Sequence, residues 1–456
     1  MSRVQRGELG GWRSRTTFLL ALSASAVGLG NLWRFSYLAG EHGGGLYVLT
    51  YLLCLFLVAV PVMVAEVVIG SHGRGGAVEA MRWATDRSLR SRGWLLLGWL
   101  ACLTGLLILS YYVVVAGWAV AYAWYMQSGL FAAASVDVVA GQFGLLLVDP
   151  LQMIYWQSLF LGVALVVLAL GIRRGLGMLV WLSVPALMVV LGMLVRFALE
   201  AGDLAATREF LFTVNPVDFS PRSVLVALGQ ALYTLGIGVG VGINYGAYAP
   251  RRTPIGRSVI AVAVFDSAIA LLAGVAIFPV VFANNLEPSI GPGLLFVSLP
   301  YAFGNIVQGD LFGTLFFALV VIAALGSVVA MLECLVAVLI QALRIGRFTA
   351  VVLVGAVVWL LAMLVAGSFD PGANLLPFAG GELFGLLDTV TADVLLPLVA
   401  LLTAIFVGWR LRSEILRRAL YRELDLFYSL WRCLLRYVAP PAIVIIIAAR
   451  LFGAQA

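Results

Sequence analysis

The sequence predicts an all-α polytopic membrane protein in which two of the helices are broken. Only 11% of its 456 residues are charged and 63% are hydrophobic, whereas soluble domains carry about 25% charge. Its apolar stretches are continuous instead of alternating, which is typical of membrane helices and not of barrel strands. Glycine-rich interruptions fall in the first and the sixth of these stretches. This composition excludes a soluble globular protein.

Eleven apolar stretches are long enough to cross about 30 Å of hydrocarbon. We expect each of them to form one membrane-spanning helix. In chain order they are 15–38, 45–70, 94–127, 151–171, 175–198, 222–247, 257–283, 311–341, 348–367, 384–408 and 435–453.

The arginines predict the orientation of these helices. The chain has no Lys, and nearly all of its 28 Arg residues fall in segments that are cytoplasmic if the N-terminus is cytoplasmic. The exceptions are Arg34, Arg196, Arg208, Arg222 and Arg450. Basic residues accumulate on the cytoplasmic side of membrane proteins. We therefore expect a multi-pass protein of the inner (plasma) membrane with its N-terminus inside and its C-terminus outside. The net charge of +6 reflects this topology, and no nucleic-acid partner is predicted.

The two interruptions predict a transporter. The first span contains AVGLGNLWRF at 26–35, and the sixth contains TLGIGVGVG at 234–242. Broken backbone persists at membrane depth only where it lines a cavity or is buried in protein. Paired broken helices in two halves of a chain indicate an inverted repeat with a binding site near the midplane. Taken alone, either glycine cluster is also explained by close helix packing.

Longer motifs carry a resemblance to a known family. They include SAVGLGNLWRFSYLAGEHGGG at 25–45, GQALYTLGIGVG at 229–240, GPGLLFVSLPYAF at 291–303 and AALGSVVAMLE at 323–333. The chain resembles the bacterial eleven-helix amino-acid transporters of the neurotransmitter:sodium symporter family. The resemblance implies an inverted five-plus-five helix repeat with broken helices 1 and 6, in which helices 1, 2, 6 and 7 move to alternate access.

The resemblance divides the chain into five parts. These are a cytoplasmic N-terminal segment at 1–14, a first five-helix repeat at 15–198, a second inverted repeat at 222–408, a cytoplasmic basic segment at 409–434, and helix 11 with the C-terminus at 435–456.

The resemblance also implies two sodium sites. The first would use the carbonyl of Ala26, the side chains of Asn31 and Thr234, and Asp266, which stands where the family usually has Asn. The second would use the carbonyls of Ala24, Val27 and Ala323 with the hydroxyl of Ser327. Gly326 lacks the side-chain oxygen that the family has beside it, so Ser or Thr there is expected to strengthen the site. A capping Asn31 and a back-bonded Thr234 are the purely structural alternatives.

The substrate is expected to be an α-amino acid. Family members that carry amines place an Asp at the Gly28 position, whereas a glycine leaves room for a substrate carboxylate. That carboxylate would meet the first sodium, the backbone near Leu29 and Gly30, and the Tyr112 hydroxyl, while the ammonium would meet Ser327 and free carbonyls. The whole predicted pocket comprises Ala26, Gly28, Leu29, Gly30, Ile108, Tyr112, Tyr233, Thr234, Gly236, Val239, Ser327 and Met331. Small residues at 236 and 239 predict a wide apolar pocket.

The resemblance also predicts gate residues and supporting residues. Arg34 and Asp388 would form an outer ion pair over the substrate. Leu9 and Gln341 replace both partners of the family's inner ion pair, so none is predicted, although Tyr248 is at its expected place. Glu66 is expected to accept hydrogen bonds from backbone N–H groups that the broken helices release. Chloride is not expected to be required, because Ala270 replaces the Ser of chloride-dependent relatives and Asp266 supplies a fixed negative charge.

These observations predict a sodium-coupled symporter that imports a hydrophobic or aromatic amino acid, with one or two sodium ions, its substrate and the lipid bilayer as its partners. A proton-coupled amino-acid carrier and a non-transporting amino-acid sensor with the same fold are the alternatives. An enzyme is not expected, since no nucleophile–base pair or metal cluster is evident and His42 and His72 are the only histidines.

Overall fold

The computed structural model describes residues 10–213, 218–286, 293–370 and 382–452. Throughout these ranges the regular secondary structure is helical. Nine helices of this described part are long and apolar enough to cross a membrane, and Arg15–Ala26 with Gly30–Glu41 forms one further, bent span. The sixth predicted span consists of two short helices. The predicted all-α polytopic architecture is therefore confirmed.

The first half of the chain contains five spans with connecting helices. The spans are α1 (Arg15–Ala26) with η1 (Gly30–Arg34) and α2 (Phe35–Glu41); α3 (Gly45–Cys54) with η2 (Leu55–Ala59) and α4 (Val60–Gly73); α6 (Leu95–Gln127); α8 (Pro150–Ala169); and η4 (Ile172–Leu176) with α9 (Gly177–Ala201). The connecting helices are α5 (Ala77–Ser88), η3 (Arg92–Trp94), α7 (Val136–Leu147) and α10 (Leu204–Phe212).

The second half of the chain contains the other six spans. They are α11 (Pro221–Thr234) with α12 (Val241–Tyr248); α13 (Ile255–Ala283); α15 (Gly309–Leu343); α16 (Arg347–Gly367); α17 (Glu382–Thr389) with η6 (Val390–Leu395), α18 (Leu396–Ile405) and η7 (Phe406–Arg410); and α20 (Asp425–Cys433) with η8 (Leu434–Val438) and α21 (Ala439–Phe452). The connecting helices are η5 (Leu294–Ser298), α14 (Leu299–Gly304) and α19 (Ser413–Ala419).

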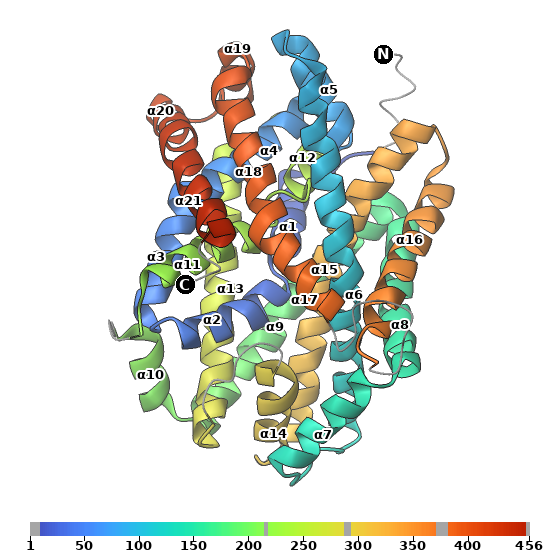
Figure 1. Ribbon diagram of the computed structural model, residues 1–456, viewed down its shortest axis with the longest axis vertical. Coiled ribbons are helices and arrows are strands. Elements are labelled where there is room, and N and C mark those ends of the chain that lie inside the picture. Colours follow the sequence, from blue (N-terminus) through green and yellow to red (C-terminus); the bar gives the residue numbers. More distant parts are fainter. Residues whose placement is uncertain (1–9, 214–217, 287–292, 371–381, 453–456) are drawn as a thin grey trace.

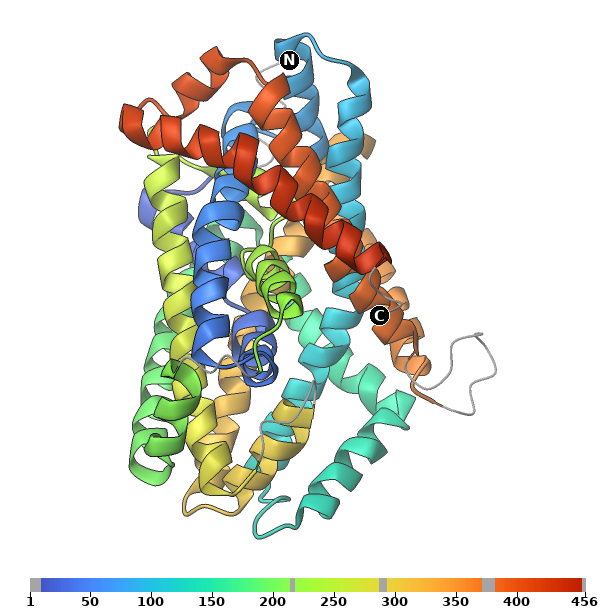
Figure 2. The ribbon, with the colours of Figure 1, turned by 60° about the vertical axis from the view of Figure 1, so that its left-hand side comes forward.

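The helices form one bundle around the two broken spans. The long helices α6 and α15 pack on each other, α12 packs on α4, and α13 packs on α9. The helices α5, α19 and α20 lie at one end of the bundle, and α7, α10 and α14 lie at the other (Figure 1). The eleventh helix begins at Asp425 rather than near residue 435, and it crosses one side of the bundle obliquely (Figure 2).

The first span is broken at Val27, Gly28 and Leu29, where its two halves meet at an angle of 56°. The backbone groups at the break find partners outside the helix. The Gly28 N–H donates to Asn31 Oδ1 at 3.1 Å, and the Leu29 N–H donates to the Tyr112 hydroxyl at 3.0 Å. These bonds satisfy donors that would otherwise be costly in a membrane interior.

The sixth span is broken between Thr234 and Val241, where Gly236, Gly238 and Gly240 have φ values of +63°, +87° and +77°. Residues with a Cβ rarely adopt this left-handed conformation, which explains the glycines at alternate positions. The Gly238 N–H donates to Glu66 Oε1 at 2.8 Å. The expected hydrogen bond from released backbone to Glu66 of α4 is therefore present in the structure.

Replacing Gly238 by Ala tests the need for glycine at this break. An alanine would be strained at φ +87°, and its Cβ would lie 3.0 Å from the carbonyl oxygen of Leu396. We expect Gly238→Ala to destabilise the detergent-purified protein by about 1–2 kcal/mol, measured as a lower melting temperature. Gly229→Ala in the same span is the control, since a Cβ there has nothing within 4 Å. Equal melting temperatures for the two variants would contradict the argument.

Candidate functional site

A buried carboxylate joins the two helix breaks. Asp266 of α13 is fully buried, and its Oδ1 accepts from Asn31 Nδ2 at 2.8 Å. Its Oδ2 accepts from the Thr234 hydroxyl at 2.9 Å and from the Tyr51 hydroxyl at 3.4 Å. Asn31 and Thr234 are buried too. The structure thus brings together the three side chains that the sequence predicts for the first sodium site.

These groups suit an alkali cation. Hard cations prefer oxygen ligands, and this cluster offers a carboxylate, an amide oxygen and a hydroxyl beside the interrupted backbone. Ala26, whose carbonyl is the fourth predicted ligand, is buried at the end of α1. Within the described ranges no group of three or more His, Cys, Asp or Glu residues could hold a metal ion. With one carboxylate among otherwise neutral oxygens, the cluster itself suits a monovalent ion.

A second small cavity lies between α1, α9 and α15. It has a volume of about 10 Å³ and is lined by Ala24, Val27 and Ala323, whose carbonyls are the predicted ligands of the second sodium site. A cavity of this size accommodates about one water-sized species. Ser183 of α9 also lines it, and its hydroxyl is buried without a hydrogen-bond partner in the described structure. The sequence prediction missed Ser183.

The two α15 residues predicted to matter at this second site behave differently. Ser327 donates to the carbonyl of Ser25 at 3.2 Å and lines the neighbouring pocket. A Cβ at Gly326 would collide with the Ala24 carbonyl oxygen, so the glycine lets α15 approach α1 closely. The expectation that Ser or Thr at 326 would strengthen the site is therefore wrong, because either side chain would push the two helices apart.

A pocket with a volume of about 40 Å³ lies between the breaks and α6, α15 and α18. Eleven of the twelve predicted substrate residues line it, namely Ala26, Gly28, Gly30, Ile108, Tyr112, Tyr233, Thr234, Gly236, Val239, Ser327 and Met331. The twelfth, Leu29, instead contributes its N–H to the Tyr112 hydroxyl. The prediction missed Ser25, Val241 and Leu396. Leu396 of α18 narrows the space that the small residues at 236 and 239 were expected to leave wide.

Gly28 faces the polar end of this pocket. A Cβ there would lie 2.6 Å from both the Ser327 and the Tyr112 hydroxyl oxygens. Any side chain at this position would therefore occupy the space between the two hydroxyls. The polar end combines these hydroxyls with backbone groups of the first break, which is a suitable environment for a small polar or charged ligand group.

The predicted outer gate residues lie near each other but do not form an ion pair. The Arg34 guanidinium stacks on the Tyr233 ring at 4.6 Å, and Asp388 accepts from the Tyr111 hydroxyl at 3.2 Å. Among the ion pairs of the described residues, none joins Arg34 to Asp388. Since Tyr233 lines the pocket, Arg34 covers it from the side of α2.

On the opposite side of the pocket, a buried polar network replaces the missing inner ion pair. Glu333 of α15 pairs with Arg347 of α16 and accepts from the Tyr248 hydroxyl at 2.8 Å. Trp12 packs on the Tyr248 ring and donates its backbone N–H to the Tyr248 carbonyl at 3.0 Å. Gln341 accepts from the Gly76 N–H at 2.9 Å. The signal for this network was Glu333 itself, a carboxylate inside an apolar span.

Comparisons with known proteins agree with the geometry. The profile of the Sodium:neurotransmitter symporter family matches residues 9–133 and 148–455. The uncharacterized sodium-dependent transporter YhdH of Bacillus subtilis is 32% identical, over 95% of this chain and 96% of its own length. The Sodium- and chloride-dependent GABA transporter 2 of Homo sapiens is 25% identical, over 88% of this chain and 73% of its own.

A solved structure is similar over nearly the whole length. The crystal structure of MhsT in complex with L-phenylalanine superimposes with a TM-score of 0.87 and 33% identity. The match covers 97% of this chain and 99% of MhsT. The overall fold described above is therefore shared with that protein.

Proposed function

The chain belongs to the sodium:neurotransmitter symporter family, and on this basis we propose that it is a sodium-coupled symporter that imports a hydrophobic or aromatic amino acid by alternating access. It is a multi-pass membrane transporter and not an enzyme. One observation carries the proposal. The buried Asp266 cluster adjoins a pocket with a mostly apolar lining, and Thr234 belongs to both. Ala26, the fourth predicted ligand of the first sodium site, also lines the pocket.

The substrate class is supported by the pocket. Gly28 keeps the space between Tyr112 and Ser327 free for a carboxylate, and Ile108, Val239, Met331 and Leu396 offer an apolar surface to a side chain. MhsT, with its similar fold, was solved with L-phenylalanine bound. We expect the substrate to have a medium-sized or flat side chain, because Leu396 narrows the pocket.

Two sodium ions are proposed, one at the Asp266 cluster and one in the small cavity beside Ser183. At a membrane potential of about 100 mV, negative inside, moving one positive charge inward releases about 2.3 kcal/mol of free energy. A roughly tenfold sodium gradient adds about 1.4 kcal/mol for each ion. One coupled ion can therefore drive accumulation of a net-neutral substrate by several hundredfold, and a second ion multiplies that ratio again.

Alternating access needs a closure on each side of the pocket. Arg34, Tyr233 and Asp388 are proposed to close the outer side. Tyr248, Glu333 and Arg347 are proposed to close the inner side, where their hydrogen bonds connect α12 to the rigid α15 and α16. This arrangement agrees with an N-terminus in the cytoplasm and a C-terminus outside the inner membrane, because the arginine-bearing α5 and α19 lie at the same end of the bundle (Figure 1).

Uptake and binding by the native protein test the substrate class. Proteoliposomes should accumulate labelled L-phenylalanine or L-leucine when sodium is higher outside. The decarboxylated amines should bind about a hundredfold more weakly or worse, since a charged contact contributes up to about 3 kcal/mol. Gly28→Asp should abolish amino-acid binding, whereas Gly28→Ala, which adds a Cβ but no charge, should retain weak binding.

Three outcomes of this experiment contradict the proposal in different ways. Equal binding of an amino acid and its amine refutes the carboxylate site. Binding without gradient-driven accumulation identifies a sensor. Accumulation driven by a pH gradient in the absence of sodium identifies a proton-coupled carrier.

Transport should not depend on chloride. Asp266 is a buried carboxyl group that would supply a negative charge next to the proposed sodium, and Ala270, one helical turn later, is buried and has no hydroxyl with which to bind an anion. Replacing chloride with gluconate should leave the uptake rate unchanged. Asp266→Asn combined with Ala270→Ser should create chloride dependence, and a strong chloride requirement of the native protein would refute the idea.

Ser183 should be a ligand at the second sodium site. Removing one oxygen contact should cost about 1 kcal/mol, so Ser183→Ala is expected to raise the half-saturating sodium concentration about fivefold. The readout is the sodium dependence of the melting temperature of the purified protein, which does not require transport. Ser258→Ala is the control, because that buried hydroxyl bonds to the Pro254 carbonyl at 2.6 Å and lies outside the cavity. An unchanged sodium dependence in Ser183→Ala would exclude this role.

A further inference from the structure

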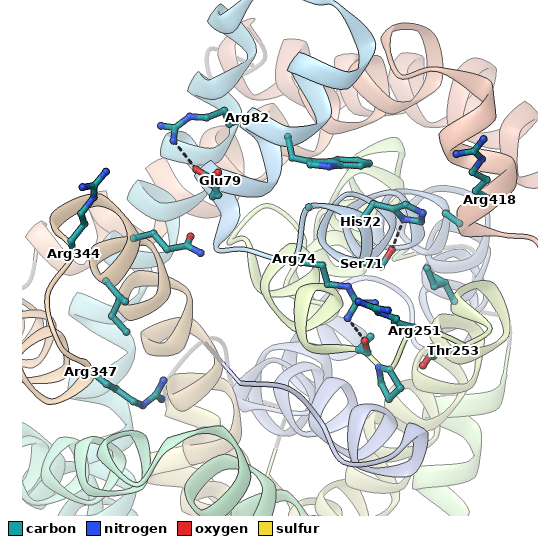
Figure 3. Close-up of a pocket in the computed structure, with 18 of the residues that line it drawn as sticks. Ser71, His72, Arg74, Glu79, Arg82, Arg251, Thr253, Arg344, Arg347 and Arg418 are labelled. Carbon is teal, nitrogen blue, oxygen red and sulfur yellow. Dashed lines mark hydrogen bonds and ion pairs between the residues drawn. The ribbon is translucent and has the colours of Figure 1, made fainter. Parts of the chain in front are cut away.

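A large basic cavity opens at the end of the bundle that carries α5 and α19. It has a volume of about 1020 Å³ and is formed by the end of α4, α5, the α12–α13 connection, the end of α15 and α19 (Figure 3). Six arginines line it: Arg74, Arg82, Arg251, Arg344, Arg347 and Arg418. Glu79 is the one acidic residue of its described lining.

Three of these six arginines already form an ion pair or hydrogen bonds within the protein. Arg82 pairs with Glu79 at 2.6 Å, Arg347 pairs with Glu333, and Arg74 donates to the carbonyls of Ala247 and Ala249. In contrast, Arg251, Arg344 and Arg418 make no ion pair with any described carboxylate. The cavity therefore carries positive charge that its described surroundings leave uncompensated.

Two of these arginines meet at the α12–α13 connection. Arg74 and Arg251 lie next to each other there, close to Thr253 (Figure 3). Burial and the neighbouring Arg251 both lower the pKa of Arg74. Bringing two guanidinium groups together costs free energy unless an anion offsets their repulsion. This proximity favours a bound anion over an accidental arrangement.

A buried hydroxyl at the same place gives a second, independent indication. Thr253 is only 7% exposed and lines the cavity, and its Oγ1 has no hydrogen-bond partner within the described structure. Buried polar groups normally have a partner. A general accumulation of arginines on the cytoplasmic side explains the charge but not this unsatisfied hydroxyl beside it.

We propose that Arg74, Arg251 and Thr253 form a binding site for a phosphate group, with Arg418 of α19 adding positive charge from another wall of the same cavity. Guanidinium groups recognise phosphate oxygens through paired N–H donors, and the Thr253 hydroxyl supplies a further donor. The ligand is inorganic phosphate, a phosphate-bearing solute or a phospholipid headgroup, which share this chemistry. A bound phosphate would connect the end of α4 to the α12–α13 connection.

Phosphate binding can be tested without any assumption about transport. The full chain is purified in a neutral detergent, and binding of ³²P-labelled inorganic phosphate is measured by equilibrium dialysis at constant ionic strength, with gluconate as the balancing anion. Phosphate should also raise the melting temperature. In the double variant Arg251→Gln/Arg418→Gln we expect at least tenfold weaker binding, and in Thr253→Val a loss of about threefold.

Arg252→Gln is the matched control, because Arg252 is the exposed neighbour of Arg251 and does not line the cavity. It should bind phosphate like the native protein. A second arm compares nanodiscs of phosphatidylcholine with and without phosphatidylglycerol. Stabilisation by phosphatidylglycerol that the double variant loses, without binding of free phosphate, would support the site and assign it to a lipid headgroup.

Two results would overturn the proposal. One is the absence of any effect of phosphate and of phosphatidylglycerol that depends on Arg251 and Arg418. The other is equal weakening by Arg252→Gln, which would mean diffuse attraction to a positive surface instead of a defined site.

Discussion

Every backbone N–H and C=O group inside the membrane needs a partner, and the rest of this structure depends on how the two broken helices meet that constraint. Breaking α1 from η1 and α11 from α12 releases backbone groups where no water is available. The chain supplies partners from other spans: Glu66 for Gly238, Tyr112 for Leu29, and Gln230, which donates to the Gly30 carbonyl at 3.0 Å. These side chains hold the breaks open in a fixed shape.

The same polar groups give the centre of the bundle its chemistry. Asp266 binds Asn31 and Thr234 at once, so one carboxylate couples the first break to the sixth span. A cation placed among these oxygens would exchange hydrogen bonds for coordination without exposing a new polar group. Burying the Asp266 carboxylate costs free energy. Hydrogen bonds from Asn31 and Thr234 offset that cost in this structure, and coordination of a cation would offset it in the same way.

The sequence was informative where polar or glycine residues interrupt apolar spans. Asn31, Thr234, Asp266 and Glu66 stood out because a polar residue in hydrocarbon requires a reason, and eleven of the twelve predicted pocket residues line one cavity. Ser183, Leu396 and the partnership of Glu333 with Arg347 were missed because each depends on which helices face each other. Gly326 was misinterpreted for the same reason, since only the approach of α15 to α1 explains its lack of a side chain.

One helix, α15, carries residues of several of these features in a single rigid element. Ser327 and Met331 line the pocket, and Glu333 anchors the network with Arg347 and Tyr248. With a rise of about 1.5 Å per residue, Met331 and Glu333 are separated by only about 3 Å along the helix axis. A substitution that shifts α15 to admit a new substrate would therefore disturb the network as well. A substitution at Ile108, Val239 or Leu396 changes the pocket from other segments of the chain and leaves the residues of α15 in place.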